Sequence, residues 1–132
     1  MIFNAEKDDG EDTFTGKIRF NRVTVNEGSG MSSDGFVAPY DGHYKMSFSA
    51  VGSFYKKGIY TWVKVQKNGS RVFWIADGND ARSSHGNNIS HDWIMELKKG
   101  DKLTFEVHSR SYLTADSIVP LNFNGQLVLA ES

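Results

Sequence analysis

The stretch GHYKMSF, residues 42–48, decides the fold of this chain. Tyr44, Met46 and Phe48 are large and apolar, and each is separated from the next by a polar residue. An alternation with a period of two is typical of a β-strand with one face in a core and the other in water. The stretch therefore predicts a strand on one face of a β-sandwich.

The same alternation continues through the sequence on both sides of this stretch. It recurs at the apolar positions Ile18, Phe20, Val23, Val25, Val63, Val65, Trp93, Met95, Leu97, Leu103, Phe105, Val107, Phe123, Leu127 and Leu129. No segment sustains the i, i+3, i+4, i+7 pattern of an amphipathic helix. Short strands joined by turns, without helices between them, predict an antiparallel sandwich or jelly roll.

A hairpin signal lies in the middle of this pattern. Asn68-Gly69 separates β-rich runs at 61–65 and 72–75. Both residues of such a pair accept positive φ, which makes the pair a strong indicator of a tight β-turn. The second run alternates in two registers, and the sequence leaves open whether Trp74 or Phe73 faces the core.

The composition describes one globular domain that spans residues 1–132. Of the 132 residues, 39% are hydrophobic, which is enough to bury a core. No apolar run approaches the ~20 residues needed to cross a bilayer, so we expect no membrane insertion. The net charge is −1 and the basic residues form no stripe, which disfavours a nucleic-acid partner.

Two further observations bear on the compartment. The chain has no cysteine, and therefore neither disulfides nor zinc thiolates. Its first residues do not form a signal-peptide pattern. These residues leave two alternatives open, an intracellular protein and the mature chain of a secreted one.

No arrangement of residues typical of an enzyme occurs in the sequence. The histidines and serines do not form a nucleophile elbow, and the glycine-rich segment 26–30 is not followed by the Lys-Ser/Thr pair of a phosphate loop. The acidic residues of segment 6–12 lack the D-x-D-x-D-G spacing of a calcium loop. We therefore expect a binding protein without catalytic residues.

Several motifs, in order along the chain, resemble the C1q globular domain. In that family a Phe and an Asn precede a G-x-F-x-x-P-type segment and then G-x-Y-x-F-x-F, matched here by Phe20, Asn26, 35–39 and 42–48. The other matching motifs are FNA at 3–5, VQKNG at 65–69, LKKGDKL at 97–103 and FNGQL at 123–127. Met31 and Met46 replace the usual aromatic residues, and the segment 31–36 is shorter than in the family, which indicates a divergent member.

The resemblance implies a ten-stranded antiparallel jelly roll of the C1q and tumour-necrosis-factor type. It also implies a compact homotrimer, in which one face of each subunit is buried along a threefold axis. Trp62 lies on the nominally polar face of its strand, where a large apolar side chain marks either a subunit contact or a sugar-stacking surface. Strand alternation explains Trp93, Phe105 and Phe123, and Trp74 in one of its two registers, by packing on a buried face. With the trimer implied, the residues expected at the subunit interface are Tyr44, Trp62, Phe105 and Phe123.

Calcium is the one cofactor that the sequence suggests. Some C1q-like trimers hold calcium near the threefold axis, and the resemblance places one ligand position near Gly69 and another on Asp77. Gly69 offers no carboxylate, which weakens a site for an ion that prefers six to eight oxygen ligands. Asp80 is the candidate to compensate, so Asp77 and Asp80 are the expected ligands, with solvated turn acids as the alternative. His85 and His91 lack the spacing of a transition-metal pair.

The function implied by the resemblance is recognition of extracellular ligands, such as surface glycans or proteins, by a secreted trimer. Three weak sites on one rigid head raise the avidity for a repetitive surface. The expected ligand contacts are His85 and Arg82, whose planar fork suits a carboxylate or phosphate. The alternatives are a trimeric signalling ligand of the tumour-necrosis-factor type and the trimerising head of a matrix or appendage protein.

Two glycosylation sequons begin at Asn68 and Asn88. Both lie where the sequence predicts turns or loops, as an acceptor must. Their use depends on a secretory eukaryotic source.

Overall fold

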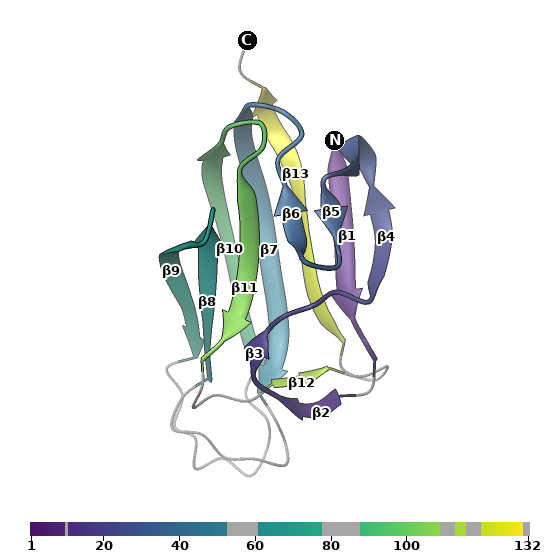
Figure 1. The fold of residues 1–132 in the computed structure, drawn as a ribbon, viewed down its shortest axis with the longest axis vertical. Coiled ribbons are helices and arrows are strands. Elements are labelled where there is room, and N and C mark those ends of the chain that lie inside the picture. Colours follow the sequence, from purple (N-terminus) through teal and green to yellow (C-terminus); the bar gives the residue numbers. More distant parts are fainter. Residues whose placement is uncertain (10, 53–60, 78–87, 109–112, 116–119, 131–132) are drawn as a thin grey trace.

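The chain folds into two antiparallel β-sheets that pack face to face (Figure 1). The computed structural model describes residues 1–9, 11–52, 61–77, 88–108, 113–115 and 120–130. Within these ranges it has thirteen strands and one 3-10 turn, η1 (Glu27–Ser29). The predicted all-β sandwich is confirmed. The strand count exceeds ten because short pieces such as β3 and β5, of two residues each, count as separate strands.

Sheet A contains seven strands among the described residues, and the decisive stretch of the sequence lies inside it. Its main part runs in the order β10 (Asn88–Leu97), β7 (Gly42–Gly52), β13 (Leu121–Ala130), β1 (Ile2–Lys7) and β4 (Arg22–Asn26). The short strand β12 (Leu113–Ala115) pairs with the end of β7, and β2 (Glu11–Phe14) pairs with β12. The last strand of the chain is therefore central, with β7 on one side and β1 on the other.

In the part of the chain that the structure describes, sheet B contains six strands, and it covers the inner face of sheet A. Its order is β5 (Met31–Ser32), β6 (Gly35–Val37), β11 (Lys102–Val107), β8 (Thr61–Lys67) and β9 (Ser70–Asp77), and β3 (Gly16–Lys17) pairs with β11. The edge strands β9 and β10 meet at one side of the sandwich. There the Phe73 ring lies 5.5 Å from His91 and 5.2 Å from Trp93.

The core is a set of aromatic rings supplied by both sheets. Phe123 is fully buried, and its ring centroid lies 4.7 Å from Phe105 and 5.2 Å from Phe3. The Phe3 ring in turn stacks on Phe36 at 4.2 Å. Since Phe3 and Phe123 belong to sheet A and Phe36 and Phe105 to sheet B, these contacts hold the two layers together.

Tyr44 shows how the core accommodates a polar atom. Its side chain is fully buried, and the hydroxyl donates a hydrogen bond of 2.6 Å to the carbonyl oxygen of Tyr40 while accepting one from the Tyr40 amide. Burial raises the pKa of the Tyr44 phenol. The hydroxyl is thus satisfied locally, and the alternating burial predicted for Tyr44, Met46 and Phe48 is confirmed.

Two turns interlock at one end of the sandwich. Asn68 and Gly69 have φ of 53° and 84°, as the hairpin signal predicted, and they join β8 to β9. The Asn68 amide donates to the Asp101 carboxylate at 3.0 Å and accepts from the Lys102 backbone N–H at 2.9 Å. Asp101 also accepts from the Lys98 backbone N–H at 2.9 Å. These hydrogen bonds lower the pKa of Asp101, because they favour its charged form.

The D101N variant is therefore expected to lose stability in a pH-dependent way. A carboxyl with a lowered folded pKa stabilises the fold above its unfolded pKa, and this contribution disappears as pH falls through the folded value. We expect a deficit of roughly 1 kcal/mol at pH 7, which vanishes towards pH 2. Urea unfolding of both proteins across this range measures it.

Asp34 offers a matched control for this experiment. Its carboxylate pairs with the exposed Arg19 at 2.6 Å, and D34N should change stability little at either pH. A D101N deficit that persists unchanged at pH 2 would contradict a role for the Asp101 charge.

Candidate functional site

The residues expected to bind metal and ligand lie at or beyond the end of the described segment 61–77. Asp80, Arg82 and His85 fall outside the described residues, and so does the side chain of Asp77, whose backbone ends β9. A calcium site at Asp77 and Asp80 and a ligand contact at Arg82 and His85 stay predictions. Within the described ranges, no group of three or more His, Cys, Asp or Glu side chains is placed to hold a metal ion.

Three of the four expected interface residues lie inside the subunit. Tyr44 and Phe123 are 0% exposed and Phe105 is 1% exposed, so none of them can contact another chain. Their assignment to the interface was wrong, because alternation marks a buried face without showing whether a sheet or a second subunit covers it. Trp62, the fourth residue, is 37% exposed, on the outer face of sheet B.

The two sequons differ in their surroundings. Asn68 lies in a turn as predicted, but both polar atoms of its side chain bind neighbours, Nδ2 to Asp101 and Oδ1 to Lys102. Asn88 begins strand β10 and pairs with Val51, so its placement in a loop was wrong. Glycosylation at either position stays a prediction.

The outer face of sheet A has two parts. Its register aligns Ile2, Gln126, Lys45 and Ile94 in one row across β1, β13, β7 and β10. Leu129 lies one row further towards the end of the sheet. We call Ile2, Ile94 and Leu129 the apolar end, since these side chains are 46%, 63% and 61% exposed.

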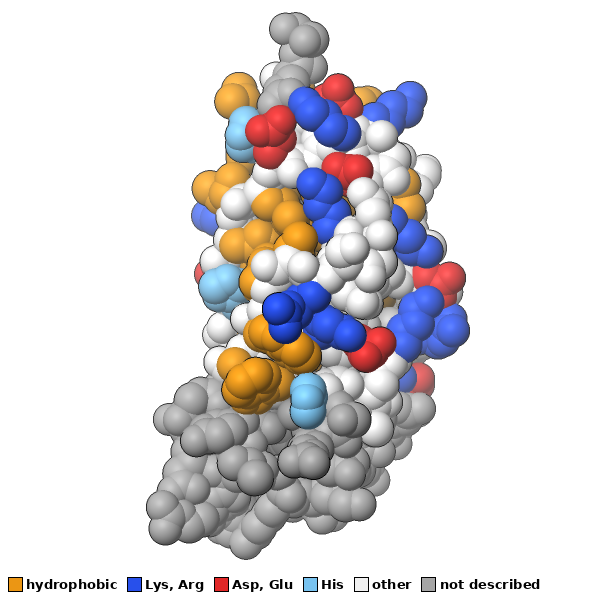
Figure 2. Space-filling view, turned by 60° about the vertical axis from the view of Figure 1, so that its left-hand side comes forward, with side chains coloured by type: hydrophobic (Ala, Val, Ile, Leu, Met, Phe, Trp, Pro, Cys, Tyr) orange, Lys and Arg blue, Asp and Glu red, His pale blue; other side chains and the backbone are white. Residues whose placement is uncertain are grey.

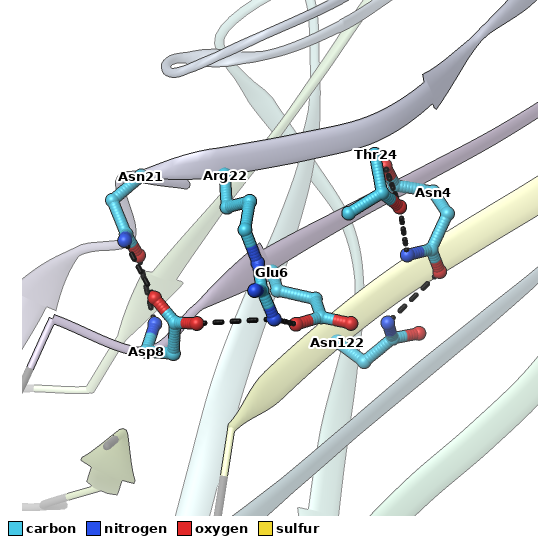
Figure 3. A network of polar contacts seen from close by, with 7 residues as sticks. All are labelled: Asn4, Glu6, Asp8, Asn21, Arg22, Thr24 and Asn122. Carbon is cyan, nitrogen blue, oxygen red and sulfur yellow. Dashed lines mark hydrogen bonds and ion pairs between the residues drawn. The ribbon is translucent and has the colours of Figure 1, made fainter. Parts of the chain in front are cut away.

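The other part of this face is polar. Asn124 donates to Asn122 at 2.6 Å, Asn122 donates to Asn4 at 2.9 Å, and Asn4 donates to Thr24 at 2.7 Å. Figure 3 shows how Asn4 links Thr24 on β4 to Asn122 on β13. A hollow of about 490 Å³ lies between this amide chain and the apolar end, and Ser47 contributes to its lining.

The acids next to this amide chain are neutralised by arginine. Figure 3 shows the Arg22 guanidinium between the carboxylates of Glu6 and Asp8, and its distance to Asp8 is 3.1 Å. The hydrogen bond to Glu6 raises the pKa of Arg22 further. Asp8 also accepts a hydrogen bond from Asn21 at 2.7 Å. These contacts join β1 to β4, and both Glu6 and Asp8 are ion-pair partners of Arg22.

A second exposed surface lies on the outer face of sheet B. The ring centroid of Trp62 on β8 lies 5.5 Å from that of Trp74 on β9 and 6.2 Å from that of His108, which follows β11. The Arg71 guanidinium lies 5.5 Å from the centre of the Trp74 ring. We call these four residues the Trp62 cluster. In Figure 2, hydrophobic side chains lie beside Lys, Arg and His side chains on the face shown there.

Part of the Trp62 cluster could have been found in the sequence. The run of Leu103, Phe105 and Val107 places His108 on the opposite, outward face of its strand. Of the two registers that the sequence left open for this run, the one that places Trp74 in the core was wrong: Lys64 lies opposite Trp74 and shares the outer face with it, while Phe73 and Ile75 point inward. The structure also has a register shift between Val65 and Gln66, which no feature of the sequence indicates.

The architecture defines the class of the protein. Two antiparallel sheets with a central C-terminal strand and an aromatic core form a jelly roll of the C1q and tumour-necrosis-factor type. A family model described as C1q domain matches residues 2–128, and the chain therefore belongs to the C1q domain family. No curated protein sequence matches the chain.

Similar solved structures agree with this assignment at the level of the fold. The globular domain of zebrafish complement 1qA has a TM-score of 0.75 and 17% identity and covers 98% of both chains. Eiger, a tumour necrosis factor from S. frugiperda, has a TM-score of 0.68 and 8% identity, over 100% of this chain and 95% of that one. Murine APRIL has a TM-score of 0.60 and 11% identity, over 96% of this chain and 100% of that one.

Proposed function

We propose that the protein is a non-enzymatic recognition module that acts outside the cell as a homotrimer and binds glycans or proteins. Membership of the C1q domain family supports the recognition role, and relatives with this fold generally form trimers that bind ligands. Three copies of a weak site on one rigid body bind a repetitive surface with high avidity.

The observation that carries the trimer is the apolar end of sheet A. Ile94 and Leu129 each expose more than three fifths of their side chains, on a face that also carries Ile2. Exposed apolar groups gathered on one face mark contact surfaces, because their burial against a partner releases ordered water. We infer that this end of sheet A faces the threefold axis. Tyr44, Phe105 and Phe123, which the core buries, are not part of this contact.

The double variant I94E/L129E is expected to convert the trimer into a monomer. It places a carboxylate on each of the two most exposed members of the apolar end, and burying such charges in an interface costs far more than the apolar contact contributes. We expect the dissociation constant of the assembly to rise by roughly 100-fold or more. Sedimentation equilibrium at micromolar concentration measures this change.

V37E is the matched control. Val37 is 38% exposed on β6 of sheet B, away from the apolar end, and its replacement should leave the trimer intact. A wild-type monomer, or an I94E/L129E protein that remains a trimer, would contradict the proposed assembly.

The resemblance to Eiger and APRIL favours one alternative, a signalling ligand of the tumour-necrosis-factor type. A panel of immobilised glycans and a pull-down with cell-surface receptors separate the two functions. Binding to glycans supports the recognition module, and a blank panel together with capture of a receptor supports the signalling ligand.

A further inference from the structure

The Trp62 cluster lies outside the core of the subunit. Val63 and Val65, which flank Lys64 on β8, are 0% exposed and point into the sandwich. Trp62 lies on the opposite face of the same strand and is 37% exposed. The cluster therefore contributes little to the contact between the sheets, although it contains two of the three tryptophans of the chain.

The spacing of the rings limits what the cluster can bind. Trp62, Trp74 and His108 lie 5.5 to 6.2 Å apart, centroid to centroid, and their planes are inclined by 59° to 63°. Rings at this distance pack directly against each other, which leaves no space for a cation between them. Arg71 already supplies a cation to the Trp74 ring. A ligand must therefore approach the outward side of the cluster, and a positively charged one is disfavoured.

The charges around the cluster favour an anionic group. Within the described residues, the Arg71 guanidinium has no carboxylate within ion-pair distance, and its residue is exposed. The nearby Lys64 is partly neutralised by Glu106 at 3.4 Å. A planar guanidinium that already lies against an aromatic ring retains donors that match the two oxygens of a carboxylate.

From these observations we propose that the Trp62 cluster is a binding site for a sugar that carries a carboxylate. The weakly positive C–H groups of the sugar ring contact the electron-rich face of Trp62, and the carboxylate is bound by Arg71. Among the described residues, Arg71 is the one guanidinium without a carboxylate partner. This and the chain's net charge of −1 favour an acidic sugar over a nucleic acid, which needs a basic track along its backbone. This inference rests on the proposed recognition function and names the ligand class of one site.

The test uses trigalacturonic acid and its methyl ester, which share the same rings but differ in charge. Titration calorimetry and tryptophan fluorescence follow binding, in a W93F background for the fluorescence because Trp93 lies outside the cluster. We expect the acid to bind, W62A to weaken binding roughly tenfold or more, and R71Q to bind the acid no better than the ester. R71K should restore part of the difference, because it returns the charge without the planar fork.

Y40A is the matched control for W62A. Tyr40 is 50% exposed and lies in another part of the fold, so its loss should leave binding unchanged. The thermal midpoint of each variant shows that the fold is intact, and W62F, which retains an aromatic ring, should bind better than W62A. Equal binding by W62A and wild type would overturn the site. Tighter binding of oligothymidylate than of trigalacturonic acid, abolished by W62A, would assign the cluster to a nucleic acid instead.

Failure of this site and failure of the proposed function give different results. The cluster lies within one subunit, so the monomeric I94E/L129E variant should bind trigalacturonic acid with the same affinity per site. Dissociation of the trimer by W62A would make the cluster a subunit contact and would overturn the inference. Glycan binding that is insensitive to W62A and R71Q would overturn the site while leaving the recognition function in place.

Discussion

Replacing Phe123 with alanine is expected to lower the free energy of unfolding by about 3 to 5 kcal/mol. The Phe123 ring lies at the centre of the core and contacts the rings of Phe3, Phe20, Trp93 and Phe105. Its removal loses the burial of a large apolar side chain and leaves a cavity that the surrounding rings cannot fill. Urea unfolding followed by fluorescence measures the loss.

This experiment also separates a core role from an interface role. Y40A removes an exposed aromatic ring and should change the free energy of unfolding by far less. F123L, which retains most of the volume, should recover much of the stability. A Phe123 variant that dissociates the trimer but leaves the unfolding of the subunit unchanged would contradict the core assignment.

The second large effect is expected from G125A, which should lower the free energy of unfolding by about 1 to 3 kcal/mol. Gly125 lies on β13 with its α-carbon facing the core, where a Cβ would lie 2.6 Å from Cζ of Phe3 and 2.8 Å from the carbonyl oxygen of Lys45. The oxygen belongs to the backbone of the neighbouring strand and cannot move without disturbing sheet A. The measurement is again the midpoint and slope of urea unfolding.

A double-mutant cycle with Phe3 identifies the cause. F3L replaces the Phe3 ring with a shorter side chain that has no Cζ atom. The loss of unfolding free energy caused by G125A should therefore be smaller in the F3L background than in the wild type. Equal losses in both backgrounds would show that the Phe3 ring is not the obstacle. Close packing against Phe3 and Lys45 thus explains why the FNGQL motif at 123–127 has a glycine at position 125.

The fold was predictable because its signals are local. Alternation at Tyr44, Met46 and Phe48 depends only on neighbouring residues, and so does the turn at Asn68 and Gly69. The two-residue strands β3 and β5 carry no such signal, since they exist only where another strand supplies hydrogen-bond partners.

The candidate sites were harder to predict, because they depend on which elements meet in space. Alternation assigned Phe105 and Phe123 to a buried face, but only the packing of sheet B on sheet A shows what covers them. Trp74 and Arg71 join the surface of Trp62 through the pairing of β8 with β9. The apolar end likewise depends on the register of β1, β13, β7 and β10, which brings Ile2 into line with Ile94.

The position of β13 between β7 and β1 has a consequence for the synthesis of the chain. Ile2 pairs with Gln126, so β1 leaves the ribosome long before the strand with which it pairs has been synthesised. Pairing between such distant segments slows folding, because the entropy of closing a long loop is lost before the contacts form. Until β13 arrives, β1 and β7 each present an open edge to other chains. The nascent protein therefore has to be kept from aggregating until β13 has been synthesised and has paired with them.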